Sequence, residues 1–218
     1  MCSTYAGQGM AQAFAKHTKG NAHIIIIGRK KEAAESIIST FPKPTSTEAK
    51  HEFVQVDATL MANVHSTTSE LLSRLPKINY LIMSPGVMTM AGRNETSEGI
   101  DKKLALHYYC RFAFTYDLLP LLKKAEELGE DAKAFSVFSA GHGGTINLAD
   151  LGLKKTFSLK NAGLQGVSYM DAAYKVCRVV LDAELKLTSF PLRNSPTKTP
   201  PPSLPSLTPT PAPSTPIL

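Results

Sequence analysis

Short apolar runs alternate along this chain with longer segments whose apolar residues recur at helical spacing. The apolar runs predict strands over residues 23–27, 52–57, 79–83 and 134–138. The longer segments predict helices over residues 9–16, 31–41, 60–75, 98–128 and 168–187, with Pro120 as a kink or break in the fourth. The order of elements therefore alternates strand and helix.

The first run, His23 to Ile27, is apolar at consecutive positions, which is typical of a parallel strand buried on both faces. Alternating strands and helices predict an α/β fold, a doubly wound parallel sheet with helices on both faces. Ligands of such sheets bind beyond the carboxyl ends of the strands. The residues that follow the predicted strands are therefore the candidates for a site: Arg29, Asp57, the Ser-Pro-Gly run ending at Gly86, and Ser139.

The first predicted helix begins at a turn of small residues that includes Gly7 and Gly9. Such a turn ahead of a helix can receive a phosphate on its backbone amides. Only Met1 and Cys2 precede the turn, so the sequence predicts that the first, central strand of the sheet is missing. The strands at 23–27 and 79–83 must then pair directly or keep open inner edges, at about 1–3 kcal/mol for each buried unpaired group.

The last part of the chain differs in composition from the rest. Residues 195–218 hold nine prolines, and no glycine follows Gly166. We therefore predict one α/β domain over residues 1–190 and a disordered Pro/Ser/Thr-rich tail over 191–218. A proline-rich ligand for a recognition domain is the alternative for the tail. The abrupt change in composition favours the hypothesis of an altered reading frame, a retained intron or an alternative ending.

The composition indicates in which cellular compartment the chain works and which classes of partner it binds. No apolar run approaches the ~18 residues that span a bilayer, and no basic segment followed by an apolar one marks a secretory signal. The three cysteines lack metal-ligand spacing, which suits a reducing, cytoplasmic setting. The net charge of +6 comes from dispersed residues, so we expect neither nucleic acid nor membrane as a partner. A small anion such as a dinucleotide fits this charge, and the oligomeric state stays open.

From Ser3 to about Leu187 the chain resembles a short-chain dehydrogenase/reductase, in particular the divergent fungal branch of that family. The family's Gly-x-x-x-Gly-x-Gly turn appears as Ser3, Gly7 and Gly9, with serine in place of the first glycine. The resemblance implies a Rossmann-like fold in which the amides at Gly7 and Gly9 approach a pyrophosphate. A helix that simply starts with small residues is the alternative interpretation of the motif.

The resemblance also implies a cofactor. Arg29 stands where the family reads the adenine ribose, and a guanidinium there pairs with a 2′-phosphate, so NADP is expected over NAD. Asp57 stands where the family holds the adenine amino group. Gly86 ends a Ser-Pro-Gly run in place of the family's Asn-Ala-Gly. The alternative for Arg29 is a surface arginine.

The catalytic positions of the family are only partly present. His107 stands in place of the family's helical asparagine, Ser139 matches its substrate-binding serine, and Tyr169 its proton-transferring tyrosine. The family's lysine four residues later is here Ala173, and Lys175 lies about 240° round the helix from Tyr169. The pairs Tyr174–Arg178 and Asp171–Lys175 have the four-residue spacing, but neither combines a tyrosine with a lysine. The Tyr/Lys dyad is therefore expected to be broken.

The sequence leaves three classes of function open. The resemblance implies an NADP-dependent oxidoreductase that acts on a small carbonyl or alcohol substrate, with impaired activity, and no metal. The alternative is a non-catalytic NAD(P)-binding remnant or truncated gene product. A basic nucleic-acid binder is a third class, which would predict salt-dependent retention on DNA.

Overall fold

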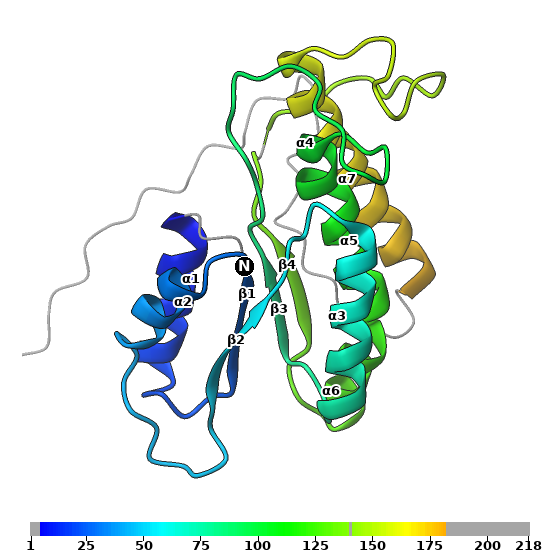
Figure 1. Ribbon diagram of the computed structural model, residues 1–218. Helices are drawn as coiled ribbons and strands as arrows, with labels where there is room; N and C mark the ends of the chain where they lie inside the picture. The colour runs from blue at the N-terminus through cyan, green and yellow to red at the C-terminus, as the bar shows by residue number, and fades with distance from the viewer. Residues whose placement is uncertain (1–4, 140, 182–218) are drawn as a thin grey trace, which may run out of the picture.

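The computed structural model of the protein describes residues 5–139 and 141–181 (Figure 1). Its elements alternate between helix and strand, as the sequence predicts. In chain order they are α1 (Tyr5–His17), β1 (Ile24–Gly28), α2 (Lys31–Ile38), β2 (His51–Gln55), α3 (Met61–Arg74), β3 (Tyr80–Met83), α4 (Lys102–Leu104), the π-helical turn η1 (Ala105–Tyr109), α5 (Cys110–Asp117), α6 (Leu119–Glu127), β4 (Lys133–Ser136) and α7 (Leu159–Leu181).

The strands form two parallel pairs rather than one continuous sheet. β1 pairs with β2 from Ile24 opposite His51 to Gly28 opposite Gln55. β3 pairs with β4 from Tyr80 opposite Lys133 to Met83 opposite Ser136. Within residues 5–139 and 141–181, neither β1 nor β3 has a second strand partner. Of the two outcomes expected from the sequence, direct pairing of β1 with β3 is therefore wrong, and the described residues form two separate pairs.

Helices cover both faces of the strands (Figure 1). α1 and α2 lie against β1 on one face, around a cluster of buried residues that includes Ala15, Ile26 and Ile37. α3, α5 and α6 cover the other face with a larger cluster that includes Leu71 and Leu122. The α/β fold with parallel strands is therefore confirmed.

Three helices begin at places that the sequence pattern did not give, and the first of them, α1, begins at Tyr5 rather than at residue 9. The helix expected from residue 98 begins at Lys102, because the side chain of Asp101 caps it by accepting from the N–H groups of Lys103 and Leu104. α7 begins at Leu159, nine residues before the expected start, where the Ser158 Oγ accepts from the N–H of Asn161 at 3.0 Å. The predicted break at Pro120 is confirmed, because α5 ends at Asp117 and Pro120 stands in the first turn of α6.

Two sequence-based predictions concern residues that the structure does not describe. The predicted domain end at 190 and the proline-rich tail 191–218 lie outside the described residues. A search of the described helices for a membrane-spanning segment finds none of sufficient length and apolarity.

Candidate nucleotide site at the carboxyl ends of the strands

A buried arginine fixes the carboxyl ends of β3 and β4. Arg111 is 3% exposed. Its Nη1 donates to the Ser136 hydroxyl at 2.6 Å and to the Val137 carbonyl at 2.7 Å, at the end of β4. Its Nη2 donates to the carbonyl of Pro85, just after β3. One guanidinium therefore holds together the two segments that carry Gly86 and Ser139.

The π-helical turn η1 places His107 beside this arginine. Wider π turns inside α-helices are frequent at functional sites, because they reorient one side chain without ending the helix. The turn is fixed from its amino side by Lys103, which is 6% exposed and whose Nζ donates to the carbonyls of Ala91 and Gly92 at 2.8 and 3.1 Å. Both cations, Arg111 and Lys103, therefore donate to backbone carbonyls of the loops that follow β3 and β4.

His107 packs against two glycines. The N–H of Val87 donates to His107 Nε2 at 3.4 Å. A Cβ placed on Gly86 would lie 3.4 Å from that nitrogen, and one on Gly166 of α7 would lie 3.2 Å from the His107 Cβ. Burial lowers the pKa of His107 to about 4, and the charge of Arg111 adds to the effect. The imidazole is therefore neutral at pH 7.

Of the three positions of the glycine motif, the structure describes the two that lie in α1. Ser3 lies outside the described residues, while Gly7 and Gly9 stand in the first turns of α1. Gly7 is buried and Gly9 is exposed, with nothing within 4 Å of a Cβ placed on it. Gly9 is the fifth residue of α1 and thus lies inside the helix rather than in a turn before it, while the start of α1 at Tyr5 has the polarity that favours an anion.

Arg29 and Asp57 follow the neighbouring strands β1 and β2, so both lie at the carboxyl edge. The two strand ends are joined by the bond from Val56 N–H to the Gly28 carbonyl at 2.7 Å. Arg29 is exposed, and no described residue pairs with its guanidinium. The Asp57 Oδ1 accepts from the N–H and hydroxyl of Thr59 at 3.0 and 2.8 Å. Arg29 thus remains available to an anion, whereas one oxygen of Asp57 already serves the local turn.

Ser139 is exposed three residues after β4, and its carbonyl accepts from the His142 N–H at 3.3 Å. The following loop is tied to α7 by Ser168, whose Oγ accepts from the N–H of Gly144 at 2.9 Å. Gln165 donates to the Thr145 carbonyl at 2.7 Å from the same face of α7. The loop that carries Ser139 is therefore anchored to α7 at residues 144 and 145.

Tyr169 is buried and has a structural role in the fold. It is 6% exposed, and its hydroxyl donates to the Leu151 carbonyl at 3.0 Å. Its ring lies 5.4 Å from that of Tyr108, and burial raises the pKa of its phenol. The structure brings His107 to Gly86, whereas the contacts of Tyr169 among the described residues are to Leu151 and Tyr108 rather than to His107 or Ser139. Lys175 is exposed, as its position on the helix predicts.

The sequence analysis missed the residues that position this site. Arg111 stands four residues after His107 in an otherwise apolar helical segment, and a lone charge there is the one signal that could have found it. Ser168 and Gln165 carry no comparable signal. The described residues hold no group of three or more His, Cys, Asp or Glu side chains suited to a metal ion.

Comparison with known proteins places these observations in context. No protein-family model matches the chain. Oxidoreductase AN1596 of Emericella nidulans is 39% identical over 137 residues, which is 63% of this chain and 40% of that protein. Short-chain dehydrogenase/reductase SAT2 of Stachybotrys chartarum is 26% identical over 148 residues, with the same two shares. The chain thus spans about two fifths of the length of these curated relatives.

Solved structures show the same fold. The RhlG/NADP active-site complex of Pseudomonas aeruginosa matches with a TM-score of 0.54 at 16% identity, over 81% of this chain and 61% of that one. NADH-dependent reductase A1-R' complexed with NAD matches with a TM-score of 0.52 at 19% identity, over 81% and 67%. Together with the fungal oxidoreductases, these similarities confirm that the chain resembles the short-chain dehydrogenase/reductase family in sequence and shares its Rossmann-like fold.

Proposed function

We propose that the chain is the nucleotide-binding part of an NADP-dependent oxidoreductase of the short-chain dehydrogenase/reductase type that acts on a small carbonyl or alcohol compound. The observation that carries the proposal is the contact of the neutral His107 imidazole with Gly86 at the carboxyl end of β3. Open sheets of this kind bind ligands at that edge. Curated relatives named as oxidoreductases and a structural neighbour with NADP support the same assignment.

The residues at this edge fit a dinucleotide. Arg29 offers an exposed guanidinium without a partner in the described part of the chain, which suits a 2′-phosphate. Gly7 lies in the first turn of α1 and Gly9 in the second, and the positive end of the helix favours a pyrophosphate near that first turn. When bound, the nicotinamide supplies or accepts a hydride. The proposed cofactor residues are Gly7, Gly9, Arg29, Asp57 and Gly86.

In this proposal the protein orients the substrate and handles the proton. Ser139 donates its hydroxyl to the substrate oxygen, and the neutral His107 accepts from the Val87 N–H and so holds the loop that follows β3. Tyr169 is the candidate for the proton, but its phenol already donates to Leu151. Proton transfer from Tyr169 therefore requires that bond to break, so slow turnover is expected.

Binding without turnover is the second candidate function, and the bond from Tyr169 to Leu151 favours it. Titration of the purified chain with NADPH and with NADH, followed by nucleotide fluorescence, separates the possibilities when oxidation of NADPH is then assayed with a panel of carbonyl compounds. Saturable NADPH binding with turnover supports the enzyme, and binding without turnover supports the second candidate. A folded chain that binds neither nucleotide contradicts both.

Arg29→Asp tests the cofactor preference. We expect it to weaken NADPH binding at least tenfold and to change NADH binding little, because only NADPH carries the 2′-phosphate. Lys30→Asp is the matched control, since it makes the same change of charge at the adjacent exposed position. Equal effects of the two substitutions would assign the loss to general electrostatics.

A further inference from the structure

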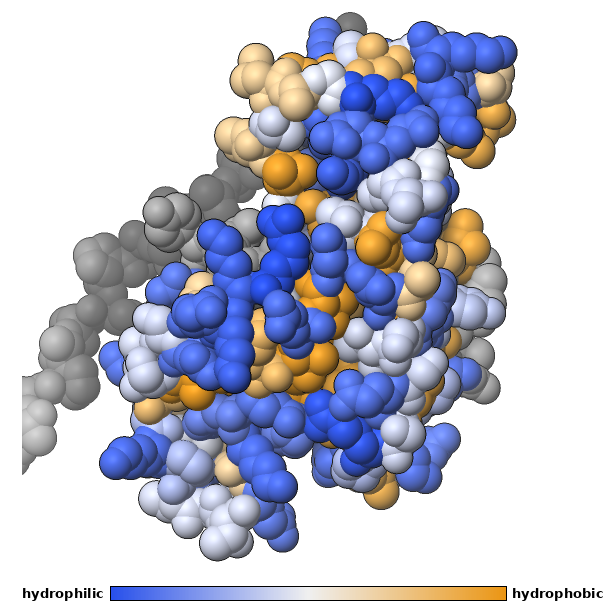
Figure 2. Space-filling view, viewed as in Figure 1, coloured by the Kyte–Doolittle hydropathy of each residue, from blue (hydrophilic) through white to orange (hydrophobic). Residues whose placement is uncertain are grey.

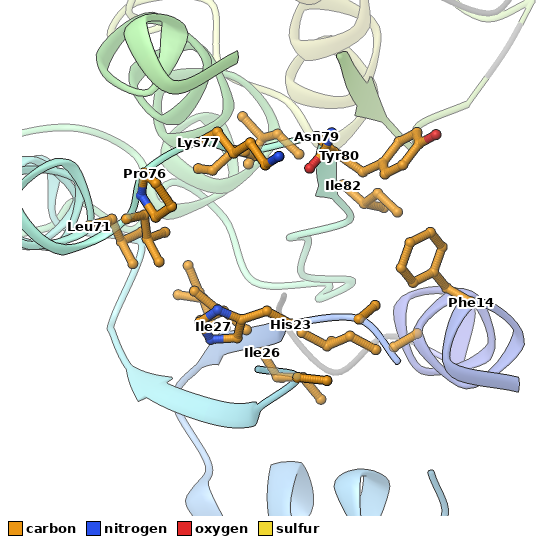
Figure 3. A pocket seen from close by; sticks show the side chains of 18 of the residues that line it. Phe14, His23, Ile26, Ile27, Leu71, Pro76, Lys77, Asn79, Tyr80 and Ile82 are labelled. Carbon is orange, nitrogen blue, oxygen red and sulfur yellow. The ribbon is translucent and has the colours of Figure 1, made fainter. Parts of the chain in front are cut away.

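The loops that follow β3 and β4 lie together at one end of the molecule, beside the start of α7 (Figure 1). Figure 2 shows hydrophilic and apolar side chains intermixed on the visible face of this end. The cavity of about 550 Å³ between β1 and β3 is a separate region (Figure 3), because the described residues that line it include neither Gly86, His107 nor Tyr169. The partners of Tyr169 are therefore found in the loops and not in that cavity.

Residues 150–156, in the loop that follows β4, form a tightly bonded segment. The Asp150 carboxylate accepts from the N–H groups of Lys154, Lys155 and Thr156 at 2.8, 3.0 and 2.8 Å. It also accepts from the Thr156 hydroxyl at 2.9 Å. These four bonds lie within the segment, so its backbone is folded onto one side chain of its own.

Two side chains from outside the segment bond to three of its successive carbonyls. The Tyr169 hydroxyl donates to the carbonyl of Leu151 at 3.0 Å. Arg93 Nη1 donates to the carbonyls of Gly152 and Leu153 at 2.6 and 3.1 Å. The phenol and the guanidinium are thus bonded to adjacent peptide groups, so a backbone shift that breaks the bonds of Arg93 also moves the acceptor of Tyr169.

The backbone at Leu153 is strained. Leu153 has φ +49°, which residues other than glycine rarely adopt, and its side chain is 1% exposed in the same cluster as Tyr169. Strain of this kind persists only where the surrounding contacts hold it. Arg93 supplies two of those contacts, at Gly152 and at Leu153 itself. Without Arg93, Leu153 can relax, and relaxation draws the Leu151 carbonyl away from the phenol.

Arg93 is itself held in place by the loop that follows β3. Its side chain is 17% exposed, and its Nε and Nη2 donate to Glu95 Oε1 at 2.9 and 2.7 Å. The next residue, Asn94, donates its N–H to Asp101 Oδ2 at 2.8 Å. Asp101 also caps α4, which leads into the turn η1 that carries His107. Arg93 therefore connects the acceptor of Tyr169 to the frame of the candidate site.

Tyr169 stands next to that site. Gly166 lies three residues earlier on α7, and a Cβ placed on it would lie 3.2 Å from the Cβ of His107. Residues three apart share one side of a helix. The ring of Tyr169 also lies 5.4 Å from that of Tyr108, the neighbour of His107 in η1.

From this geometry we propose that Arg93 is a positioning residue that keeps Tyr169 in an autoinhibited arrangement: by holding residues 151–153, it keeps the phenol bonded to the Leu151 carbonyl. The inference rests on the proposed function, because it concerns regulation of the proton step assigned there to Tyr169. Its structural part, the dependence of the phenol's bond on Arg93, can be measured without turnover.

The test uses three variants of the full chain. Arg93→Met removes the donors to Gly152 and Leu153. Arg93→Lys keeps the charge but has one ammonium in place of the fork, so its effect should be smaller. Glu95→Gln is the matched control, because it alters the other partner of the same guanidinium and leaves the bonds to the two carbonyls in place.

The first readout is the pKa of the Tyr169 phenol, followed by NMR of tyrosine labelled with ¹³C at Cζ and assigned with Tyr169→Phe. Burial raises this pKa, and Tyr109, Asp150 and Tyr108 add to the effect. Release from the Leu151 carbonyl removes a bond that favours the neutral phenol, so Arg93→Met should lower the pKa toward about 10. Loss of a positive charge alone would act in the opposite direction.

The second readout is NADPH oxidation with a panel of carbonyl compounds. Arg93→Met should raise its rate at least threefold and leave NADPH affinity within twofold. Addition of Tyr169→Phe should abolish the gain, because the gain depends on the released phenol. Glu95→Gln should change neither readout.

A phenol pKa in Arg93→Met that equals or exceeds that of the unsubstituted chain overturns the proposal, whether or not any chain oxidises NADPH. A gain in rate that survives Tyr169→Phe also overturns it. A lowered pKa with NADPH bound but no turnover in any chain supports the positioning role and contradicts the proposed enzyme. If Arg93→Met fails to fold, the direction of the pKa change in Arg93→Lys decides.

Discussion

Val87 donates its backbone N–H to Nε2 of His107 at 3.4 Å, and this fixes which nitrogen of the imidazole carries the proton. Nε2 can accept only if it is unprotonated, so the hydrogen of the neutral ring must reside on Nδ1. Protonation of Nε2 would remove the bond and place a positive charge four residues from Arg111. The contact therefore couples the end of β3 to the charge state of η1.

The first prediction concerns pH. Burial lowers the pKa of His107 from an ordinary 6.5 to about 4 in the folded chain. As pH falls below 6.5 the unfolded chain takes up the proton first, so the free energy of unfolding must decrease between pH 6.5 and 4, by at most about 3 kcal/mol. Above pH 6.5 the contribution is fully present. Urea titrations at a series of pH values measure it.

His107→Gln is the control for that series, because an amide can still accept from Val87 but does not titrate. Above pH 6.5 the difference in the free energy of unfolding between the two chains should not change with pH. Between pH 6.5 and pH 4 its change should grow as the pH falls. Parallel curves for the two chains across this range would show that His107 is not the titrating group.

The second prediction concerns Arg111. Its removal leaves the carbonyls of Pro85, Leu106 and Val137 without this donor inside the protein. We expect Arg111→Met to lower the free energy of unfolding by about 3 kcal/mol or more, because each buried unsatisfied acceptor costs about 1–3 kcal/mol. Arg111→Lys should recover only part, since one ammonium cannot reproduce the fork of the guanidinium. Denaturant unfolding at pH 7 gives both values.

Arg74→Met is the matched control. Arg74 is also paired, to Glu52 and Glu70 at 2.7 Å, but its side chain is 31% exposed. Exposed ion pairs contribute about 0–1 kcal/mol, so this substitution should cost far less. Equal losses at the two arginines would contradict the structural role assigned to Arg111.

The contrast between these arginines shows what the sequence could and could not predict. The run Ile24–Ile27 predicted a buried parallel strand because its pattern is local. The count of strands left two outcomes open, direct pairing of β1 with β3 or open inner edges, and could not decide between them. The partners of Arg111, in contrast, are loop carbonyls about 26 residues away on either side, and no local pattern encodes them. The partner of Tyr169 likewise lies in irregular chain at Leu151.

The third prediction tests whether Tyr169 serves the fold or a proton transfer. Tyr169→Phe removes the bond to Leu151, so we expect a loss of about 1 kcal/mol in the free energy of unfolding. If the phenol is held in this bond, NADPH affinity and any residual NADPH oxidation should stay within about twofold of the unsubstituted chain. Loss of all turnover with unchanged nucleotide affinity would instead identify Tyr169 as the proton donor.

The fourth prediction concerns the turn that joins α1 to β1. Gly20 has φ +79°, and a Cβ placed on it would lie 2.2 Å from the Pro42 carbonyl oxygen. Gly99 has a similar φ of +74°, but nothing lies within 4 Å of a Cβ there. Alanine at Gly99 therefore meets the left-handed backbone cost alone, about 1–2 kcal/mol. Alanine at Gly20 meets the same cost together with a collision against backbone, which a rotamer change cannot relieve. We expect Gly20→Ala to be the more destabilising by at least about 2 kcal/mol in thermal or urea unfolding. Equal losses would mean that the segment carrying Pro42, between α2 and β2, can move away from the turn at Gly20.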